Sequence, residues 1–340
     1  MRRHCHSPLF RVLCGLLCLS PFAVAHAQSE LAAFAASSGM VSPSAATGST
    51  TTLPKAQNWM SSDVSAAWSS GFSGKGTTIT FVDDFNSSSK FSGNINGTVQ
   101  TQTHGNWTSE QAGLIAYSAN IIKTDFNASG NTPVTLARGL NIINASFGMY
   151  ASSAYANYNF TYNNQVNSMV SYANSTNAVT SALIVKAAGN DAIPIGYLTA
   201  GKFMPGINAS GNFDALNKSL RGAPNVIYAG ALSTNGSSTA PAVMASYSNT
   251  AGTDPTIQKQ FLVVGVNSSQ MGIAGTSFAA PIISAYGSII GSKFTTASPT
   301  QITNQLLSTA RTDTLKNYSA AVYGRGEASL SRALAPVSIK

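Results

Sequence analysis

Short apolar runs with strand character alternate along this chain with segments of helix character, and this alternation constrains the fold more than any other feature. Strands are predicted at Thr77–Val82, Leu140–Ala145, Ala182–Ala188, Asn225–Leu232 and Phe261–Val266. Helices are predicted at Trp59–Trp68, Glu110–Asn120, Val166–Ala173 and Ser277–Ile290, with a last helix beginning at Ile302–Leu307. Such alternation indicates an α/β fold with a mostly parallel central sheet flanked by helices. No internal boundary interrupts residues 55–340, so we expect one domain there.

The first residues of the chain have the pattern of a secretory signal peptide. A basic start is followed by an apolar run at Val12–Leu19 and by small residues at Ala25 and Ala27. This pattern predicts that residues 1–27 are a signal peptide and that the protein is secreted, either to the periplasm or out of the cell. The apolar run is too short to span a bilayer, which argues against a membrane anchor. Residues 28–54, rich in Ala, Ser and Thr, are expected to be a flexible leader or a short pro-segment.

Removal of residues 1–27 would narrow the chemistry open to the rest of the chain. All three cysteines would leave, and with them any disulfide, thiol nucleophile or cysteine metal site. One of the four histidines, His104, would remain. The remaining 16 basic and 11 acidic residues give a net charge of +5 without a basic cluster, so we expect no nucleic-acid partner. No later segment is long and apolar enough to suggest a membrane span.

Paired acids end the first predicted strand. Asp83 and Asp84 directly follow its apolar residues. Open α/β sheets bind ligands at the carboxyl ends of their parallel strands, so these carboxylates could belong to a site. A solvated turn explains the same two residues equally well when this feature is taken alone.

The remaining histidine precedes the next predicted helix. His104 is followed by Gly105, and we predict that the helix begins near Thr108 or Ser109, with Glu110 in its first turn. A lone histidine is more often a packing or surface residue than a catalytic one, so only its context gives it weight.

A glycine turn before the most apolar helix carries a serine. In the run Gly275–Pro281, Ser277 stands at the predicted helix start, beside the free N–H groups of a helix N-terminus. An ordinary N-cap serine is the simpler explanation. Asn190 follows Ala187–Gly189 at the end of another predicted strand, where its amide could serve a turn or donate to an oxyanion.

Together these residues are the parts of a centre for acyl transfer. An acid, a lone imidazole, an amide and a serine occur in the order Asp83, His104, Asn190, Ser277. Acid before histidine before serine is the order of the subtilisin constellation. An esterase of the α/β-hydrolase type is disfavoured, because its acid lies between the serine and the histidine.

The chain resembles the subtilisin-like serine proteases, the subtilases of peptidase family S8, over roughly residues 57–330. Gly275–Pro281 is close to the serine motif, Ala187–Asn190 resembles the oxyanion motif, and Asn144–Gly148 resembles the strand that pairs with bound peptide. The resemblance implies a three-layer α/β fold and a secreted serine endopeptidase, a monomer that acts on polypeptides. No cofactor is identifiable: calcium is suggested by the resemblance alone, and the scattered acids predict no metal site.

The resemblance also assigns roles. It implies Ser277 as nucleophile, His104 as general base and Asp83 as the acid that orients the imidazole, with Asp84 as the alternative acid. It implies Asn190 and the Ser277 N–H as the oxyanion hole. The substrate would lie between two groups of residues, Ser146, Phe147 and Gly148 on one side and Ala187, Ala188 and Gly189 on the other.

The chain departs from the family pattern beside two of these residues. Asp84 and Phe85 stand where the family has Thr or Ser and then Gly, and Asn106 and Trp107 replace the second half of its His-Gly-Thr-His motif. These departures keep open a catalytically inactive, secreted subtilase-fold protein that binds rather than cleaves. A sedolisin-like protease is disfavoured, because it uses Glu in place of the histidine and Asp at the oxyanion site.

Overall fold

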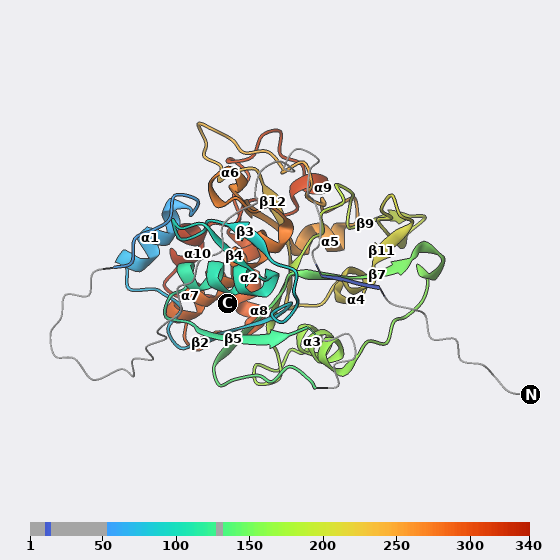
Figure 1. Ribbon diagram of the computed structural model, residues 1–340, viewed down its shortest axis with the longest axis horizontal. Coiled ribbons are helices and arrows are strands. Elements are labelled where there is room, and N and C mark those ends of the chain that lie inside the picture. The colour runs from blue at the N-terminus through green and yellow to red at the C-terminus, as the bar shows by residue number, and fades with distance from the viewer. Residues whose placement is uncertain (1–10, 15–52, 127–131) are drawn as a thin grey trace, which may run out of the picture.

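The structure of the protein is a computed structural model that describes residues 11–14, 53–126 and 132–340 (Figure 1). Most of the expected signal peptide and leader therefore lies outside the described residues. Within that part of the chain the structure describes the backbone of β1 (Arg11–Cys14) and residues 53–54. The division into signal peptide, leader and peptidase domain stays a prediction.

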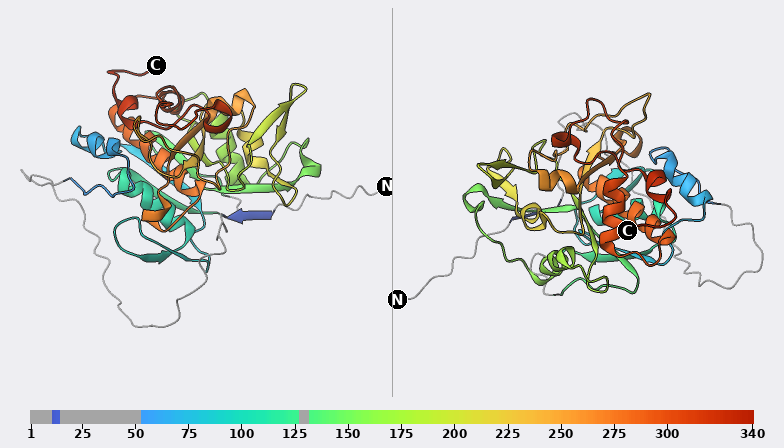
Figure 2. Two further views of the ribbon diagram at one scale, coloured as in Figure 1. Left: turned by 90° about the horizontal axis from the view of Figure 1, so that it is seen from above. Right: turned by 180° about the vertical axis from the view of Figure 1, so that it is seen from behind.

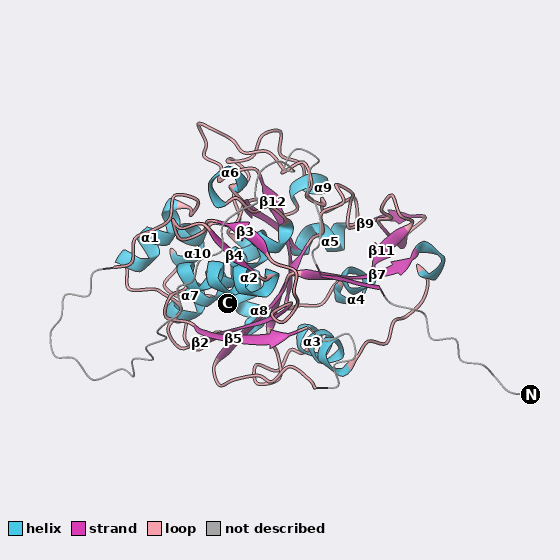
Figure 3. Ribbon diagram, in the orientation of Figure 1, coloured by secondary structure: helices cyan, strands magenta, loops and turns pink. Residues whose placement is uncertain are grey.

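A six-stranded parallel sheet forms the centre of the molecule (Figure 3). Its strands lie in the order β13-β12-β8-β6-β2-β5, and every neighbouring pair runs parallel. They are β2 (Thr77–Asp83), β5 (Asn120–Asp125), β6 (Leu140–Ala145), β8 (Leu183–Ala187), β12 (Val226–Leu232) and β13 (Phe261–Gly265). The expected α/β class with a parallel sheet is confirmed, and every strand except β5 lies within one residue of its predicted bounds.

Helices cover both faces of this sheet and make a three-layer molecule (Figure 2). One layer contains α1 (Ser62–Ser69), α2 (His104–Ile115), α6 (Ser268–Met271), α7 (Ala279–Lys293), α8 (Pro299–Ser308) and α10 (Leu330–Leu334). The other contains α3 (Asn164–Asn174), α4 (Ala215–Leu220), α5 (Pro255–Gln260) and α9 (Ala320–Tyr323). In β2, Ile79 and Phe81 pack toward the first layer and Val82 toward the second. Burial on both faces explains why these strands are continuous apolar runs.

Three smaller sheets surround the central one, and none of their strands was predicted. β7 (Phe147–Ser152) is flanked on its two sides by β1 and β11 (Asn212–Asp214), both antiparallel to it. The other two sheets are antiparallel pairs, β3 (Phe91–Gly93) with β4 (Gln100–Gln102) and β9 (Gly196–Thr199) with β10 (Lys202–Pro205). Most of these strands have only three or four residues, too few to show a clear strand pattern in the sequence.

Several helix predictions were wrong in their bounds. The helix expected at Glu110–Asn120 is α2, which begins at His104 and ends at Ile115, so Glu110 lies in its middle and Asn120 opens β5. The helix expected from Ser277 begins at Ala279, after the 3₁₀ turn η2 (Thr276–Phe278). The helix expected at Trp59–Trp68 spans Ser62–Ser69, and the predicted last helix, α8, is followed by α9 and α10.

The parallel sheet brings the candidate residues to one edge. β2 and β6 are neighbours at the point where the strand order reverses, since β5 lies on one side of β2 and the later strands lie on the other. Such a switch point leaves a crevice at the carboxyl ends of the strands. Asp83 ends β2, Ser146 follows β6 and Asn190 follows β8 by three residues, so all three belong to this edge.

Candidate active site

A carboxylate and an imidazole form a buried pair at the end of β2. His104, the first residue of α2, lies with its Nδ1 2.6 Å from Oδ1 of Asp83, and the Asp83 side chain is completely buried. The same oxygen accepts the N–H of Asp84 at 2.7 Å, and the other accepts the Thr108 hydroxyl at 2.9 Å. Both oxygens of the carboxylate are therefore held by hydrogen bonds. Because Nδ1 contacts the carboxylate, Nε2 is the ring nitrogen that remains for other partners.

Asp84, the alternative acid, faces away from the imidazole. Both of its carboxylate oxygens accept hydrogen bonds from Ser87, one from the backbone N–H at 2.9 Å and one from the hydroxyl. Of the two acids, Asp83 is therefore the one that His104 contacts. The role of either acid in catalysis stays a prediction.

Burial and charge act in opposite directions on His104. Burial disfavours the imidazolium, but the charge and hydrogen bond of Asp83, helped by the charge of Asp84, outweigh it and raise the pKa of His104 above its ordinary value. Its Nε2 is buried and has no hydrogen-bond partner among the described residues. A buried imidazole with a raised pKa and one ring nitrogen without a hydrogen bond is typical of a group that transfers protons.

Ser277 lies in the η2 turn that leads into α7. Gly275 adopts φ 137°, a conformation that favours glycine, and so turns the chain immediately before the serine. The Ser277 hydroxyl donates to the carbonyl of Ser146 at 3.3 Å, and the Ser146 hydroxyl donates back to the carbonyl of Ser277 at 3.0 Å. The ring of Phe278 lies 5.9 Å from that of His104, so the imidazole packs against the residue next to the serine.

The amide of Asn190 is fixed by the residue before the serine. Its Oδ1 accepts hydrogen bonds from the backbone N–H of Thr276 at 2.8 Å and from the Thr276 hydroxyl at 3.0 Å. The same hydroxyl accepts the N–H of Gly189 at 3.0 Å. With its oxygen held in this way, the amide turns its NH₂ group away from Thr276.

The side chain of Asn249 holds the loop that follows β8, a role that the sequence analysis did not predict. Its side chain donates to the carbonyl of Ala188 at 3.0 Å and accepts the N–H of Asp191 at 3.0 Å. Gly189 adopts φ 112°, and a Cβ there would lie 2.3 Å from Nδ2 of Asn249. Only glycine can therefore occupy this position without displacing the asparagine. The signal in the sequence was the Ala245–Asn249 run, which on its own resembles any polar turn.

The six expected substrate-contacting residues lie on two sides of the serine. Ser146 lies between β6 and β7, and Phe147 and Gly148 begin β7. Ala187 ends β8, and Ala188 and Gly189 follow it. The Phe147 ring is buried and lies 4.4 Å from that of Phe126, so only its main chain can face a ligand. The side chains of both alanines are buried as well. The contact of these residues with a substrate remains a prediction.

The departures from the family pattern beside His104 have structural explanations. The Trp107 side chain is fully buried and donates from Nε1 to the carbonyl of Phe91 at 2.9 Å, and the Phe91 ring lies 6.2 Å from that of His104. Trp107 thus holds Phe91, whose ring packs beside the imidazole of His104. Asn106 bonds instead to Thr103, at 2.9 Å.

The departures after Asp83 form an anchored loop. Asp125 at the end of β5 accepts the N–H of Phe85 at 2.9 Å and that of Asn86 at 3.1 Å. A Cβ on Gly105 would lie 2.8 Å from the carbonyl of Asp84 and 2.8 Å from the Phe85 ring. The loop therefore packs directly on the residue after the histidine.

No cluster of three or more His, Cys, Asp or Glu side chains suited to a metal ion occurs within the described residues. Of the helices in the part of the chain that the structure describes, none combines the length and apolar character that a membrane crossing requires.

Comparison with known proteins identifies the class of this site. The family model of the subtilases, the Peptidase S8 family, matches residues 63–326, well over half of the chain. The chain therefore belongs to the subtilase family, and it is a serine-type peptidase of the subtilisin-like kind. A comparison with curated proteins finds no match.

Solved structures of several proteases match the chain at low sequence identity. The MycP3 protease from the type VII (ESX-3) secretion system is 18% identical over 83% of this chain and 90% of its own, with a TM-score of 0.48. A cold-adapted subtilisin-like serine proteinase is 16% identical over 82% of this chain and 92% of its own, with a TM-score of 0.43. A protease from Pseudoalteromonas arctica is 17% identical over 81% and 94%, with a TM-score of 0.44.

Proposed function

We propose that this chain is a secreted serine endopeptidase that hydrolyses peptide bonds through Asp83, His104 and Ser277. The observation that carries the proposal is the buried Asp83–His104 pair, 2.6 Å apart, with Nε2 of the histidine left open beside the turn that holds Ser277. In this mechanism Ser277 attacks the peptide carbonyl while His104 takes its proton. The histidine then gives that proton to the leaving amine.

Asn190 and the backbone N–H of Ser277 would stabilise the oxyanion that forms. The support is the fixed orientation of the Asn190 amide, whose oxygen is held by Thr276. Loss of the corresponding amide in subtilisin, the known example, raises the barrier by about 2.7–4 kcal/mol. We expect a loss of the same order for Asn190→Ala.

The substrate would add as an antiparallel strand to the side of β7 opposite β11. That side carries β1, whose Leu13 pairs with Gly148 and whose Cys14 pairs with Phe147, so it already accepts an extended segment. Because β1 falls in the expected signal peptide, its removal on secretion would open this edge. A peptide chain of any sequence could then use the same main-chain groups.

One observation favours an inactive, ligand-binding role. The Ser277 hydroxyl donates to Ser146 at 3.3 Å rather than to the histidine. Hydrogen bonds between catalytic groups are often long or absent before substrate binds, so this contact weighs less than the Asp83–His104 pair.

Cleavage of an unfolded protein by the purified mature chain tests the proposal. Mass spectrometry should find new peptides with the wild type and with Ser292→Ala, a control that removes a serine hydroxyl elsewhere in α7. Ser277→Ala and His104→Ala should each reduce the rate by roughly 10⁶-fold, as for the corresponding residues of subtilisin. A folded wild-type protein that yields no new peptides would support the binding role instead.

A further inference from the structure

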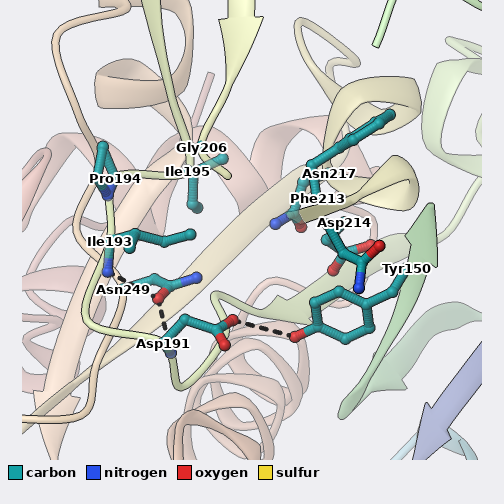
Figure 4. A pocket seen from close by; sticks show the side chains of 11 residues that line it. Tyr150, Asp191, Ile193, Pro194, Ile195, Gly206, Phe213, Asp214, Asn217 and Asn249 are labelled. Carbon is teal, nitrogen blue, oxygen red and sulfur yellow. Dashed lines mark hydrogen bonds between the residues drawn. The ribbon is translucent and has the colours of Figure 1, made fainter. Parts of the chain in front are cut away.

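A pocket lies beside the proposed active site, between β7, the loop after β8, and α4 (Figure 4). Asp191, which follows Asn190, stands on one side, and Tyr150 of β7 stands on the other. Gly148 joins the pocket to the expected substrate strand, because a Cβ there would lie 2.7 Å from the Tyr150 ring and 3.1 Å from Oδ2 of Asp214. The pocket therefore adjoins the main chain with which we expect a substrate peptide to pair.

One carboxylate in the pocket is not paired with a cation in the part of the chain that the structure describes. Asp191 is exposed, and its carboxylate accepts only two long hydrogen bonds, from the Tyr150 hydroxyl at 3.4 Å and from Nδ2 of Asn208 at 3.4 Å. Among the described residues, no Lys, Arg or His lies within 4.0 Å of it. Contacts this long are weak, so a stronger donor would displace them.

The second carboxylate is already neutralised. Nζ of Lys186 lies 2.9 Å from Oδ2 of Asp214, with the lysine side chain 1% and the aspartate side chain 9% exposed. The other oxygen of Asp214 accepts the N–H groups of Met149 and Leu216, each at 3.0 Å. Asp214 thus holds β7 and α4 on one side of the pocket, and the net negative charge of the pocket comes from Asp191.

A buried acceptor in the same pocket has no partner. Asn217 of α4 lines the pocket and is 4% exposed, and its Oδ1 is buried without a hydrogen bond among the described residues. Buried amide oxygens are nearly always paired, so this one is poised to accept from a ligand. The polar groups left open in the pocket are therefore acceptors, which match a group that only donates.

We infer that this pocket binds a lysine or arginine side chain of the substrate, on the residue at the amino side of the cleaved bond. Asp191 pairs with the positive charge, and Oδ1 of Asn217 accepts one of its N–H groups. The inference rests on the proposed function, because it assigns the preference of that same site. It makes Asp191 a specificity-determining residue and leaves the chemistry at Ser277 unchanged.

Matched peptide substrates test this preference. The peptides differ only at the residue before the cleaved bond, which is Arg, Lys, norleucine or Phe, and kcat/KM is measured for each at low salt. We expect Arg and Lys to exceed norleucine, an uncharged analogue of lysine, by roughly tenfold or more. Asp191→Asn should bring this ratio close to one, because cleavage after Arg and Lys loses the paired charge and cleavage after norleucine does not.

Asp313→Asn is the control variant, because Asp313 is a half-exposed carboxylate that pairs with Arg311 and Arg332 and does not line the pocket. It should keep the wild-type ratio. Cleavage after norleucine or Phe at least as fast as after Lys, or an unchanged ratio in Asp191→Asn, would overturn the inference and leave the proposed function intact.

Failure to cleave any of the peptides would count against the proposed function, and the pocket is then tested by binding alone. Calorimetry with Ser277→Ala should show tighter binding of the Arg peptide than of the norleucine peptide, and Asp191→Asn should remove the difference. Equal affinities for the two peptides would overturn the inference in this case as well.

Discussion

The His104 imidazole occupies a buried position that disfavours its charged form, beside a carboxylate that favours it. The carboxylate prevails because the 2.6 Å contact with Asp83 joins charge attraction to a hydrogen bond. A general base must be neutral to accept the serine proton, so the raised pKa sets the lower pH limit of the proposed reaction.

The pH dependence of activity should follow from this balance. As pH falls through the raised pKa, His104 becomes protonated, so kcat/KM should decrease with a midpoint above the ordinary histidine value of 6.5. Asp84→Asn removes one of the charges that raise this pKa and should move the midpoint to lower pH. Peptide hydrolysis measured between roughly pH 5 and pH 9, the range in which histidine titrates, gives the midpoint for both proteins. A midpoint at or below 6.5 in the wild type, or an upward shift in the variant, would contradict this balance.

Single residues differ in how far their roles can be predicted from the sequence. Ser277 and His104 could be singled out, because a serine at a helix start and the one histidine outside residues 1–27 are distinctive. Thr108 and Asn249 could not, because a threonine in a helix and an asparagine in a turn are ordinary until the fold brings them to Asp83 and Ala188. Their roles depend on contacts between distant segments.

At the scale of elements, α7 lies close against the sheet because two of its residues have no side chain. A Cβ on Gly287 would lie 3.0 Å from Leu183, and a Cβ on Gly291 would lie 2.3 Å from Leu140. The helix begins directly after the Ser277 turn, so this close packing also fixes the height of the serine above the strands.

A pair of glycine substitutions separates packing from helix propensity. Gly291→Ala should lower the free energy of unfolding by about 1–3 kcal/mol, because the new methyl group overlaps Leu140. Gly113→Ala in α2 should raise it by about 1 kcal/mol, because nothing lies within 4 Å of that position and alanine favours the helix. Urea unfolding of both variants checks the two signs. Stabilisation by Gly291→Ala would contradict the close approach of α7 to the sheet.

The misplaced bounds of α2 show what sequence patterns miss at this scale. The helix was expected to begin near Thr108 or Ser109, because Gly105 and Asn106 are poor helix formers. In the structure Gly105 is buried in the first turn, where its N–H bonds to the carbonyl of Asp84 at 2.8 Å. Contact with the Asp84 loop thus outweighs local propensity and sets the start of the helix at the histidine.

At the scale of the whole molecule, a buried carboxylate joins the last segment of the chain to its interior. Glu327 exchanges backbone hydrogen bonds with Arg311, and its Oε1 accepts the N–H of Gly236 at 2.9 Å. Among the described residues its buried Oε2 has no hydrogen-bond partner, although the nearby Thr314 hydroxyl favours the charged form. Burial outweighs these contacts and raises the pKa of Glu327 above its ordinary value.

Stability should therefore fall as Glu327 loses its proton. A carboxyl group with a raised pKa in the folded state stabilises the fold fully at pH values below its unfolded pKa. That stability is lost as pH rises through the folded pKa. Glu327→Gln should thus have a higher melting temperature than the wild type at pH 7, with a smaller difference at pH 4, as measured by thermal unfolding.

Glu110→Gln is the matched control for this change. Both oxygens of Glu110 accept hydrogen bonds, from Asn96 at 2.8 Å and from Gln102 at 2.6 Å, so its substitution should bring no stabilisation. A lower melting temperature for Glu327→Gln than for the wild type at pH 7 would contradict the cost assigned to the buried charge.

The class of the whole molecule could be predicted from the sequence, and its smaller parts could not. Strands such as Leu140–Ala145 are buried on both faces, so their apolar runs carry a strong signal. β7 was not predicted, because its place depends on pairing with β11, whose residues lie at least 60 positions away in the sequence. The pocket could not be predicted either, because Asp191 and Asn217 are brought together only by the folding of these small sheets.

The central claim is that Asp83, His104 and Ser277 act together as one catalytic unit. Labelling of the purified mature protein with a fluorophosphonate, with the modified peptide located by mass spectrometry, tests it most directly. The account predicts modification of Ser277 in the wild type and its loss in His104→Ala. A folded protein, free of any bound pro-segment, that is not modified at Ser277 would contradict the claim, and so would equal modification in the two proteins.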